Sequence, residues 1–206
     1  MNSPEDPKVA ETGQAGGPWT RSTHTTVTKN IVNSGLGDFI VGQLKPADFL
    51  EFGAGTGLLA EYIAARLPLG PSCCIEPSVS TPAQLPAALS WLNVDIFAGQ
   101  PAGVPAEPFD LVLSIEVAEH IEADKHPLLF DFLASRAGRW VVFSAARPGQ
   151  GGHGHVAERP EEAWRQEWLS RGFTFCPELT ETGRNMCNPR NINHRRNLQV
   201  FRRASP

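Results

Sequence analysis

Two glutamates and a glycine-rich turn are the residues of this 206-residue sequence whose types and spacing first suggest chemistry. Residues 51–57 read Glu-Phe-Gly-Ala-Gly-Thr-Gly, and Glu76 follows one predicted helix later. Glycines let a backbone turn sharply and approach a ligand closely, and the amides that open a following helix point into the same site. A carboxylate at the position of Glu76 can accept hydrogen bonds from both hydroxyls of a ribose. The pattern predicts a nucleoside site.

The charge of Glu51 narrows the kind of ligand. A carboxylate a few ångströms from a diphosphate would repel it, so the turn suits a dinucleotide poorly. A ligand that carries ammonium and sulfonium cations suits it better, and S-adenosylmethionine is such a ligand. A nicotinamide-binding domain and an unliganded loop remain the alternative interpretations of the turn.

A second group of chemistry-bearing residues comes later in the chain. If a helix begins at Glu116, then Glu119 and His120 lie on the same face as Glu116, three and four positions on. His155 stands in the glycine- and histidine-rich run 151–158. Two carboxylates and an imidazole could hold a divalent cation, or poise His120 as a general base. A purely structural hydrogen-bonding role is the third interpretation.

The elements that must position these residues alternate along the chain. The hydrophobic pattern predicts strands at 48–52, 72–75, 92–97, 109–115, 139–143, 173–179 and 197–202. It predicts helices at 26–44 (which Gly35 and Gly37 could divide), 56–67, 124–137 and 161–170, the last with Trp164 and Trp168 packed on the core. Alternating strands and helices imply an α/β fold with a mostly parallel sheet. Right-handed crossovers bring every strand-to-helix turn to one edge of that sheet, where ligands bind.

Four segments, in this order, resemble motifs of the class I S-adenosylmethionine-dependent methyltransferases. Residues 51–57 look like the first motif of that family, 76–78 like its second, and 109–117 like its fourth-strand motif. Residues 93–96 stand where the family places an acid that binds the adenine amino group. The resemblance spans about residues 45–145 by motif and extends to the C-terminus by element order. It implies a Rossmann-like, seven-stranded sheet with helices on both faces, six strands parallel and the last antiparallel.

The resemblance also implies which residues bind the cofactor, S-adenosylmethionine. Glu51 and the glycines would cradle the methionine part, Glu76 the ribose and Asp95 the adenine. Asp95 could instead cap the turn that follows it. The full set of candidate cofactor residues is Glu51, Gly53, Ala54, Gly55, Gly57, Glu76, Pro77, Asp95, Ile96, Ser114 and Glu116.

Two subgroups of the family are similar to this chain beyond the fourth strand. The ubiquinone-type O-methyltransferases carry a Glu-x-x-Glu-His segment of this kind. The small-RNA 2′-O-methyltransferases use such a segment and later histidines to hold Mg²⁺. Carried over by position, His120 and His155 are the candidate catalytic residues, and the candidate metal ligands are Glu116, Glu119, His120 and His155. A divalent cation is the less favoured of these interpretations.

Composition limits the class of protein. A net charge of −4 argues against bulk nucleic-acid binding, and 41% hydrophobic residues permit a real core. The sequence has no apolar run of the roughly 20 residues that span a bilayer, and its first residues lack the apolar core of a secretory signal. Cys73 and Cys74 are adjacent in a predicted strand, so we expect two buried thiols on opposite faces. We therefore expect a soluble, cytoplasmic protein, monomeric or homodimeric, with a flexible tail at 1–20 and a single methyltransferase domain at 21–206.

The favoured function is O-methylation of a small hydroxylated metabolite. A hydroxyl acceptor needs a base or a cation to take its proton, and acid and imidazole groups stand at the expected edge. The Asn/Asp-Pro-Pro-aromatic motif of base methyltransferases is absent after the fourth strand. A metal-assisted ribose methyltransferase acting on RNA and a catalytically silent cofactor-binding module remain alternatives. Six arginines and no acid follow Glu181, either to clamp an acidic acceptor or as a solvated sheet edge.

Overall fold

The computed structural model of the chain describes residues 32–68, 70–77, 85–99 and 103–204. The predicted tail at 1–20 and the start of the first predicted helix, 26–31, lie outside these residues. None of the helices in the described ranges is both long and apolar enough to cross a membrane.

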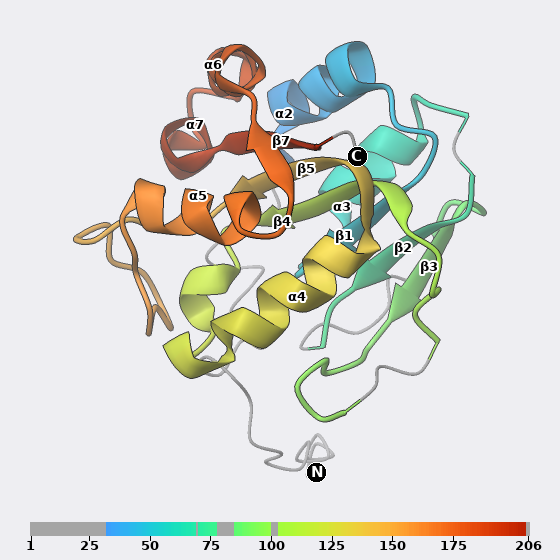
Figure 1. The fold of residues 1–206 in the computed structure, drawn as a ribbon. Helices are drawn as coiled ribbons and strands as arrows, with labels where there is room; N and C mark the ends of the chain where they lie inside the picture. Colours follow the sequence, from blue (N-terminus) through green and yellow to red (C-terminus); the bar gives the residue numbers. More distant parts are fainter. Residues whose placement is uncertain (1–31, 69, 78–84, 100–102, 205–206) are drawn as a thin grey trace, which may run out of the picture.

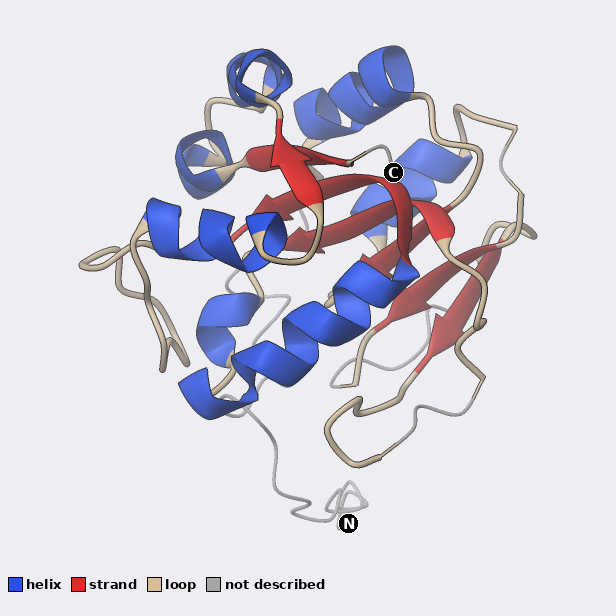
Figure 2. Cartoon of the chain, in the orientation of Figure 1, coloured by secondary structure: helices blue, strands red, loops and turns tan. Residues whose placement is uncertain are grey.

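A seven-stranded sheet forms the centre of the molecule (Figures 1 and 2). Its strands are β1 (Phe49–Phe52), β2 (Ser72–Ile75), β3 (Leu89–Leu92), β4 (Phe109–Ile115), β5 (Ala137–Ser144), β6 (Phe173–Phe175) and β7 (Gln199–Arg203). Their order is β3-β2-β1-β4-β5-β7-β6. Strands β1 to β5 pair in parallel, and β7 runs antiparallel to both β5 and β6. The predicted sheet, with six strands in one direction and the last reversed, is confirmed.

Helices cover both faces of the sheet (Figure 2). One face carries α2 (Ser34–Phe39) with the π-helical turn η1 (Ile40–Leu44), α3 (Leu58–Ala64) and α6 (Pro177–Met186), beside which lies α7 (Ile192–Asn197). The other face carries α4 (His126–Arg136) and α5 (Glu161–Leu169). Two short 3₁₀ turns, η2 (Ala118–His120) and η3 (Ala123–Lys125), lead from β4 into α4.

Each strand contributes to two cores because successive side chains point to opposite faces. Cys73 packs into the cluster that includes α4 and α5, and Cys74 into the cluster that includes α2 and α3. Both thiols are free and fully buried, as predicted. Trp164 and Trp168 of α5 are also fully buried, against Phe143 of β5 among other rings. Their predicted packing on the core is confirmed.

The third strand lies earlier in the chain than predicted. The alternating residues 92–97 suggest a strand, but β3 occupies Leu89–Leu92. Beyond Leu92 the side chain of Asp95 accepts a hydrogen bond of 2.8 Å from the amide of Phe97. This local bond closes a turn, which competes successfully with strand pairing.

The last third of the chain holds two helices that the sequence pattern does not predict. The strand expected at 173–179 ends at Phe175, because Pro177 opens α6 and proline suits the first turn of a helix. α7 then precedes β7.

The first helix is bound directly to these late helices. Its Gly35 does not divide it: a Cβ at that position would lie 1.8 Å from the carbonyl oxygen of Met186, so glycine lets α2 and α6 touch backbone to backbone. The Asn33 carboxamide caps the helix by accepting from the Leu36 amide, and it also accepts from the amide of Asn188.

Candidate active site

The glycine-rich turn lies between β1 and α3, at the carboxyl edge of the sheet. Gly53 has a φ of 74°, and a Cβ there would lie 2.4 Å from a methyl carbon of Val117. Only glycine therefore lets the turn pass against the segment after β4. The amide of Gly55 donates a 2.9 Å hydrogen bond to the Glu76 carboxylate at the end of β2. The first two predicted motifs thus meet in space.

Glu51, near the end of β1, is a buried carboxylate with an unsatisfied atom. Only 5% of the residue is exposed, and its Oε2 has no hydrogen-bond partner. Burial raises the pKa of Glu51 to about 8, and the negative charge of Glu76 adds to the effect. A cation placed beside Glu51 would offset this cost by favouring the ionised carboxylate.

The remaining predicted cofactor residues lie around this turn or on the next strands. Asp95 is exposed and already caps its own turn, while Ile96 is buried beneath it. Ser114 of β4 is fully buried and its hydroxyl has no partner. Ala54 is buried and Pro77 is exposed. The structure therefore places these residues along one edge, with Asp95 committed to a local bond.

Glu116 is not on a helix, so the predicted common helical face is wrong. Its φ is 54°, in the left-handed region that side chains rarely adopt, and only the 3₁₀ turn η2 follows it. Its carboxylate accepts hydrogen bonds from the amide groups of Gln150 (3.0 Å) and Asn197 (3.1 Å). Partners from the β5–α5 loop and from α7, far away in sequence, therefore hold Glu116.

Glu119, His120 and His155 nevertheless come together. One ligand atom of each lies within 4.8 Å of those of the other two. The two imidazole rings meet edge to face with centroids 4.9 Å apart. Glu119 is fully buried, and neither of its carboxylate oxygens has a hydrogen-bond partner. Burial raises the pKa of Glu119 well above its usual range, and the charge of Glu116 raises it further, although the nearby amides of Glu119 and Ala146 act in the opposite direction.

The loop that carries His155 is docked on the turn that carries Glu119. The amides of Val156 and Ala157 both donate to the carbonyl oxygen of Glu119, at 2.9 and 3.1 Å. Within the loop, the Glu158 carboxylate accepts from Nδ1 of His155 at 2.8 Å, and this bond lowers the pKa of Glu158. Backbone and side-chain bonds therefore fix His155 over Glu119.

The opposite side of the η2 turn is held by His126, the first residue of α4. Its Nε2 lies 3.0 Å from the carbonyl oxygens of both Ala118 and Ile121. Burial lowers the pKa of His126, which favours the neutral ring that donates from Nε2. The sequence analysis did not single out His126, Glu158 or Asn197. Only the spacing of Glu158, three residues after His155, could have drawn attention to it.

A comparison with protein families assigns the chain. Residues 32–194 match the family model described as a methyltransferase domain. The chain belongs to this methyltransferase family. The prediction of a methyltransferase from the sequence is confirmed. No curated protein matches the sequence.

Solved structures with the same fold as this methyltransferase are distant in sequence. The 1,6-didemethyltoxoflavin-N1-methyltransferase of Burkholderia thailandensis, with 1,6-didemethyltoxoflavin and S-adenosylhomocysteine bound, has a TM-score of 0.60 and 13% identity. The match covers 90% of this chain and 87% of that one. The N-methyltransferase NodS of Bradyrhizobium japonicum with S-adenosylhomocysteine has a TM-score of 0.56 and 18% identity. The match covers 90% of this chain and 87% of that one. The DhpI–S-adenosylhomocysteine complex has a TM-score of 0.58 and 14% identity, and the match covers 90% of this chain and 93% of that one. They confirm the Rossmann-like fold.

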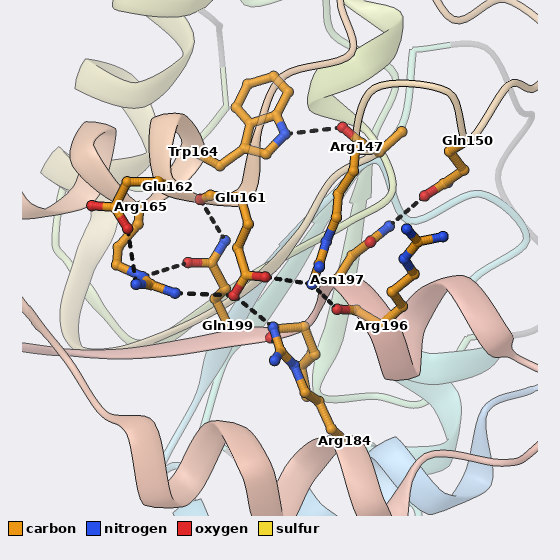
Figure 3. Close-up of polar contacts among 12 residues, drawn as sticks. Arg147, Gln150, Glu161, Glu162, Trp164, Arg165, Arg184, Arg196, Asn197 and Gln199 are labelled. Atoms are coloured by element: carbon orange, nitrogen blue, oxygen red, sulfur yellow. Dashed lines mark hydrogen bonds and ion pairs between the residues drawn. The ribbon is translucent and has the colours of Figure 1, made fainter.

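Of the six arginines that follow Glu181, Arg184 is paired with an internal carboxylate, which two earlier arginines share (Figure 3). The Glu161 carboxylate, at the start of α5, forms ion pairs with Arg147 at 2.5 Å, Arg165 at 3.0 Å and Arg184 at 2.8 Å. Arg147 also donates to the backbone carbonyl of Arg196. We name Glu161 and these three paired arginines the Glu161 cluster. Its arginines stabilise the packing of α5, α6 and the β5–α5 loop.

Proposed function

We propose that this methyltransferase transfers a methyl group from S-adenosylmethionine to a hydroxyl of a small molecule. The observation that carries the proposal is the cluster of Glu119, His120 and His155 just beyond β4. Strand β4 pairs directly with β1, which leads into the glycine turn. The cluster thus follows the strand next to the proposed cofactor site, where a hydroxyl acceptor needs a group that accepts its proton.

In this proposal the cofactor binds along the turn after β1. The ammonium and sulfonium charges of the cofactor favour the ionised form of Glu51, whose oxygen otherwise lacks a partner. Glu76 exchanges its bond with the Gly55 amide for the ribose hydroxyls, or shares it with them. Ala54, Pro77 and Ile96 supply apolar contacts around the nucleoside, while the Asp95 carboxylate caps its own turn.

The reaction itself needs mainly alignment. Methyl transfer from a sulfonium is an in-line displacement, so holding donor and acceptor in order supplies much of the acceleration. An alcohol is a weak nucleophile until its proton leaves. The imidazoles of His120 and His155 stand beside a buried carboxylate that stabilises positive charge near them.

Formation of S-adenosylhomocysteine with a panel of hydroxylated and amine acceptors tests this proposal. We expect turnover with a hydroxylated acceptor, with a rate that rises with pH as the proton acceptor becomes available. Turnover only with amines would contradict the oxygen acceptor. Cofactor binding without turnover on any acceptor would favour the catalytically silent alternative.

A further inference from the structure

We propose that Glu119, His120 and His155 form a binding site for one divalent transition-metal ion of the Zn²⁺ type. The existence of this site does not depend on the proposed function. Only the role of the cation in the methyl transfer, given below, rests on it. Glu116, a ligand candidate from the sequence, is not part of this site because amides of Gln150 and Asn197 hold its carboxylate.

The geometry needs little adjustment to hold a cation. The ligand atoms of the three residues lie within 4.8 Å of one another, and Oε1 of Glu119 is 4.0 Å from Nε2 of His155. With metal–ligand bonds of about 2.0–2.1 Å, ligand atoms of a tetrahedral zinc site lie roughly 3.3 Å apart. The ligand atoms would have to approach one another by roughly 0.7 Å from 4.0 Å, and by up to roughly 1.5 Å from 4.8 Å, to complete the arrangement.

The buried carboxylate is an independent observation that points to a cation site. Glu119 is 0% exposed, and both of its oxygens lack hydrogen-bond partners. A buried acceptor without a partner costs about 1–3 kcal/mol, and more when it is charged. Among the side chains of the described residues, none donates to it. A bound cation would satisfy one or both oxygens and neutralise their charge.

The hydrogen bonds of the two histidines prepare them as ligands. Nδ1 of His155 lies 2.8 Å from the Glu158 carboxylate, which can only accept when ionised, so this nitrogen carries the proton. Nδ1 of His120 lies 3.0 Å from the carbonyl oxygen of Gly154 and carries a proton for the same reason. A ring that donates from Nδ1 can offer the lone pair of Nε2 to a cation. Metal-binding histidines are usually oriented by such carboxylate and carbonyl partners.

The types of ligand select the class of cation. Two imidazoles and one carboxylate suit Zn²⁺ and its first-row neighbours, whereas Mg²⁺ and Ca²⁺ prefer oxygen ligands throughout. Three protein ligands leave at least one position open in a tetrahedral site. If the proposed function holds, the acceptor hydroxyl occupies that position, where the cation would lower its pKa and its proton would pass to water. The two histidines then act as ligands of the cation and not as the proton acceptor.

Metal titration of the full-length protein tests the site directly. After treatment with a chelator and dialysis, we expect one Zn²⁺ per chain by calorimetry, and visible absorption bands of four-coordinate Co²⁺ when cobalt replaces it. Glu119→Gln and His155→Gln should each weaken Zn²⁺ binding by at least about 100-fold, and Glu158→Gln by about 10–100-fold.

Matched substitutions control for position and side-chain type. Glu122 lies on the same segment, paired with Lys125, and His153 is exposed on the same loop. Glu122→Gln and His153→Gln should keep Zn²⁺ affinity within about 2-fold of the original protein, since neither contributes a ligand atom. Retained binding of S-adenosylhomocysteine shows that each variant is folded. Zn²⁺ should raise the melting temperature of the original protein but not that of Glu119→Gln.

Absence of stoichiometric Zn²⁺ binding, or Zn²⁺ binding that is equally strong in Glu119→Gln and His155→Gln, would overturn the site. The proposed function is judged separately. A bound cation without methylation of any hydroxyl acceptor contradicts the function and leaves the site standing. Turnover that survives complete removal of the cation removes the cation from the reaction.

Discussion

Glu161 and Glu119 both have carboxylates that are largely shielded from solvent, yet the two differ in their hydrogen-bond and ion-pair partners. Glu161 forms ion pairs with three arginines at 2.5–3.0 Å. Glu119 is more deeply buried and forms no hydrogen bond through its side chain. Glu51, beside the glycine turn, likewise has one carboxylate oxygen, Oε2, without a hydrogen-bond partner.

The difference separates carboxylates that hold the fold together from carboxylates kept for a ligand. Removing one partner from an internal ion-pair network leaves uncompensated charges and lowers stability. A buried carboxylate without partners instead lowers stability until a ligand binds beside it. We therefore expect changes in the Glu161 cluster to alter unfolding, and changes at Glu51 and Glu76 to alter binding.

Glu161→Ala should produce the largest effect on stability. It leaves three guanidinium groups of the Glu161 cluster without their shared counter-charge, and we expect a loss of about 2–3 kcal/mol in the free energy of unfolding. Urea denaturation measures this, with S-adenosylhomocysteine affinity unchanged. The control is Glu162→Ala, which removes a more exposed carboxylate and should cost less than about 0.5 kcal/mol. An equal loss of unfolding free energy in both variants would contradict a special role of Glu161 in stability.

Glu76→Ala should weaken cofactor binding by about 1–3 kcal/mol, because charge-assisted hydrogen bonds to the ribose are lost. Titration calorimetry with S-adenosylmethionine measures the change. Glu61→Ala, on the neighbouring helix α3, is the control and should leave the affinity unchanged. Unchanged affinity in Glu76→Ala would remove this residue from the cofactor site.

The pH dependence of the free energy of unfolding tests whether Glu51 is a buried carboxylate without a partner. Its folded pKa of about 8 exceeds the usual 4.5, so the folded state holds a proton that the unfolded state releases between these values. The contribution of Glu51 to stability is therefore fully present below about pH 4.5 and is lost as the pH rises to about 8. Glu51→Gln should remove this part of the decline, by about 1–3 kcal/mol at pH 8. Unfolding measured at pH 5 and pH 8 tests it; identical pH dependence in both proteins would contradict the assignment.

Asp95→Asn should have the smallest effect on the cofactor. The carboxylate already caps its own turn, and asparagine can accept the same bond from the Phe97 amide. We expect cofactor affinity to change by less than about 0.5 kcal/mol in titration calorimetry. A loss as large as that of Glu76→Ala would show instead that the charge of Asp95 contacts the cofactor.

The fold and the glycine turn could be predicted because their signals are local. Strand β4 is a near-continuous apolar run with the predicted bounds, and the glycines at 53, 55 and 57 all adopt positive φ. β3 was misplaced because one side-chain bond, from the Phe97 amide to Asp95, ends an alternating pattern that otherwise looks like a strand.

The arrangement of Glu116, Glu119 and His155 depends on contacts between distant segments, which no local sequence pattern contains. Glu116 takes its left-handed conformation while Gln150 and Asn197, from two later segments, hold its carboxylate. His155 meets Glu119 only because a whole loop binds the carbonyl of Glu119. The residue types were visible in the sequence, but their pairing is decided by tertiary structure.

The backbone contact between Gly35 and Met186 has a consequence for biosynthesis. Helix α2 packs on a helix made near the end of the chain, and its cap at Asn33 binds Asn188. During translation, α2 can pack on α3 soon after both are made, but its contact with α6 and Asn188 waits until residues 177–188 have left the ribosome. The Phe39 ring, which lies against Gly183 of α6 in the finished fold, is incompletely covered for that interval, and exposed apolar surface of this kind favours aggregation of partly made chains.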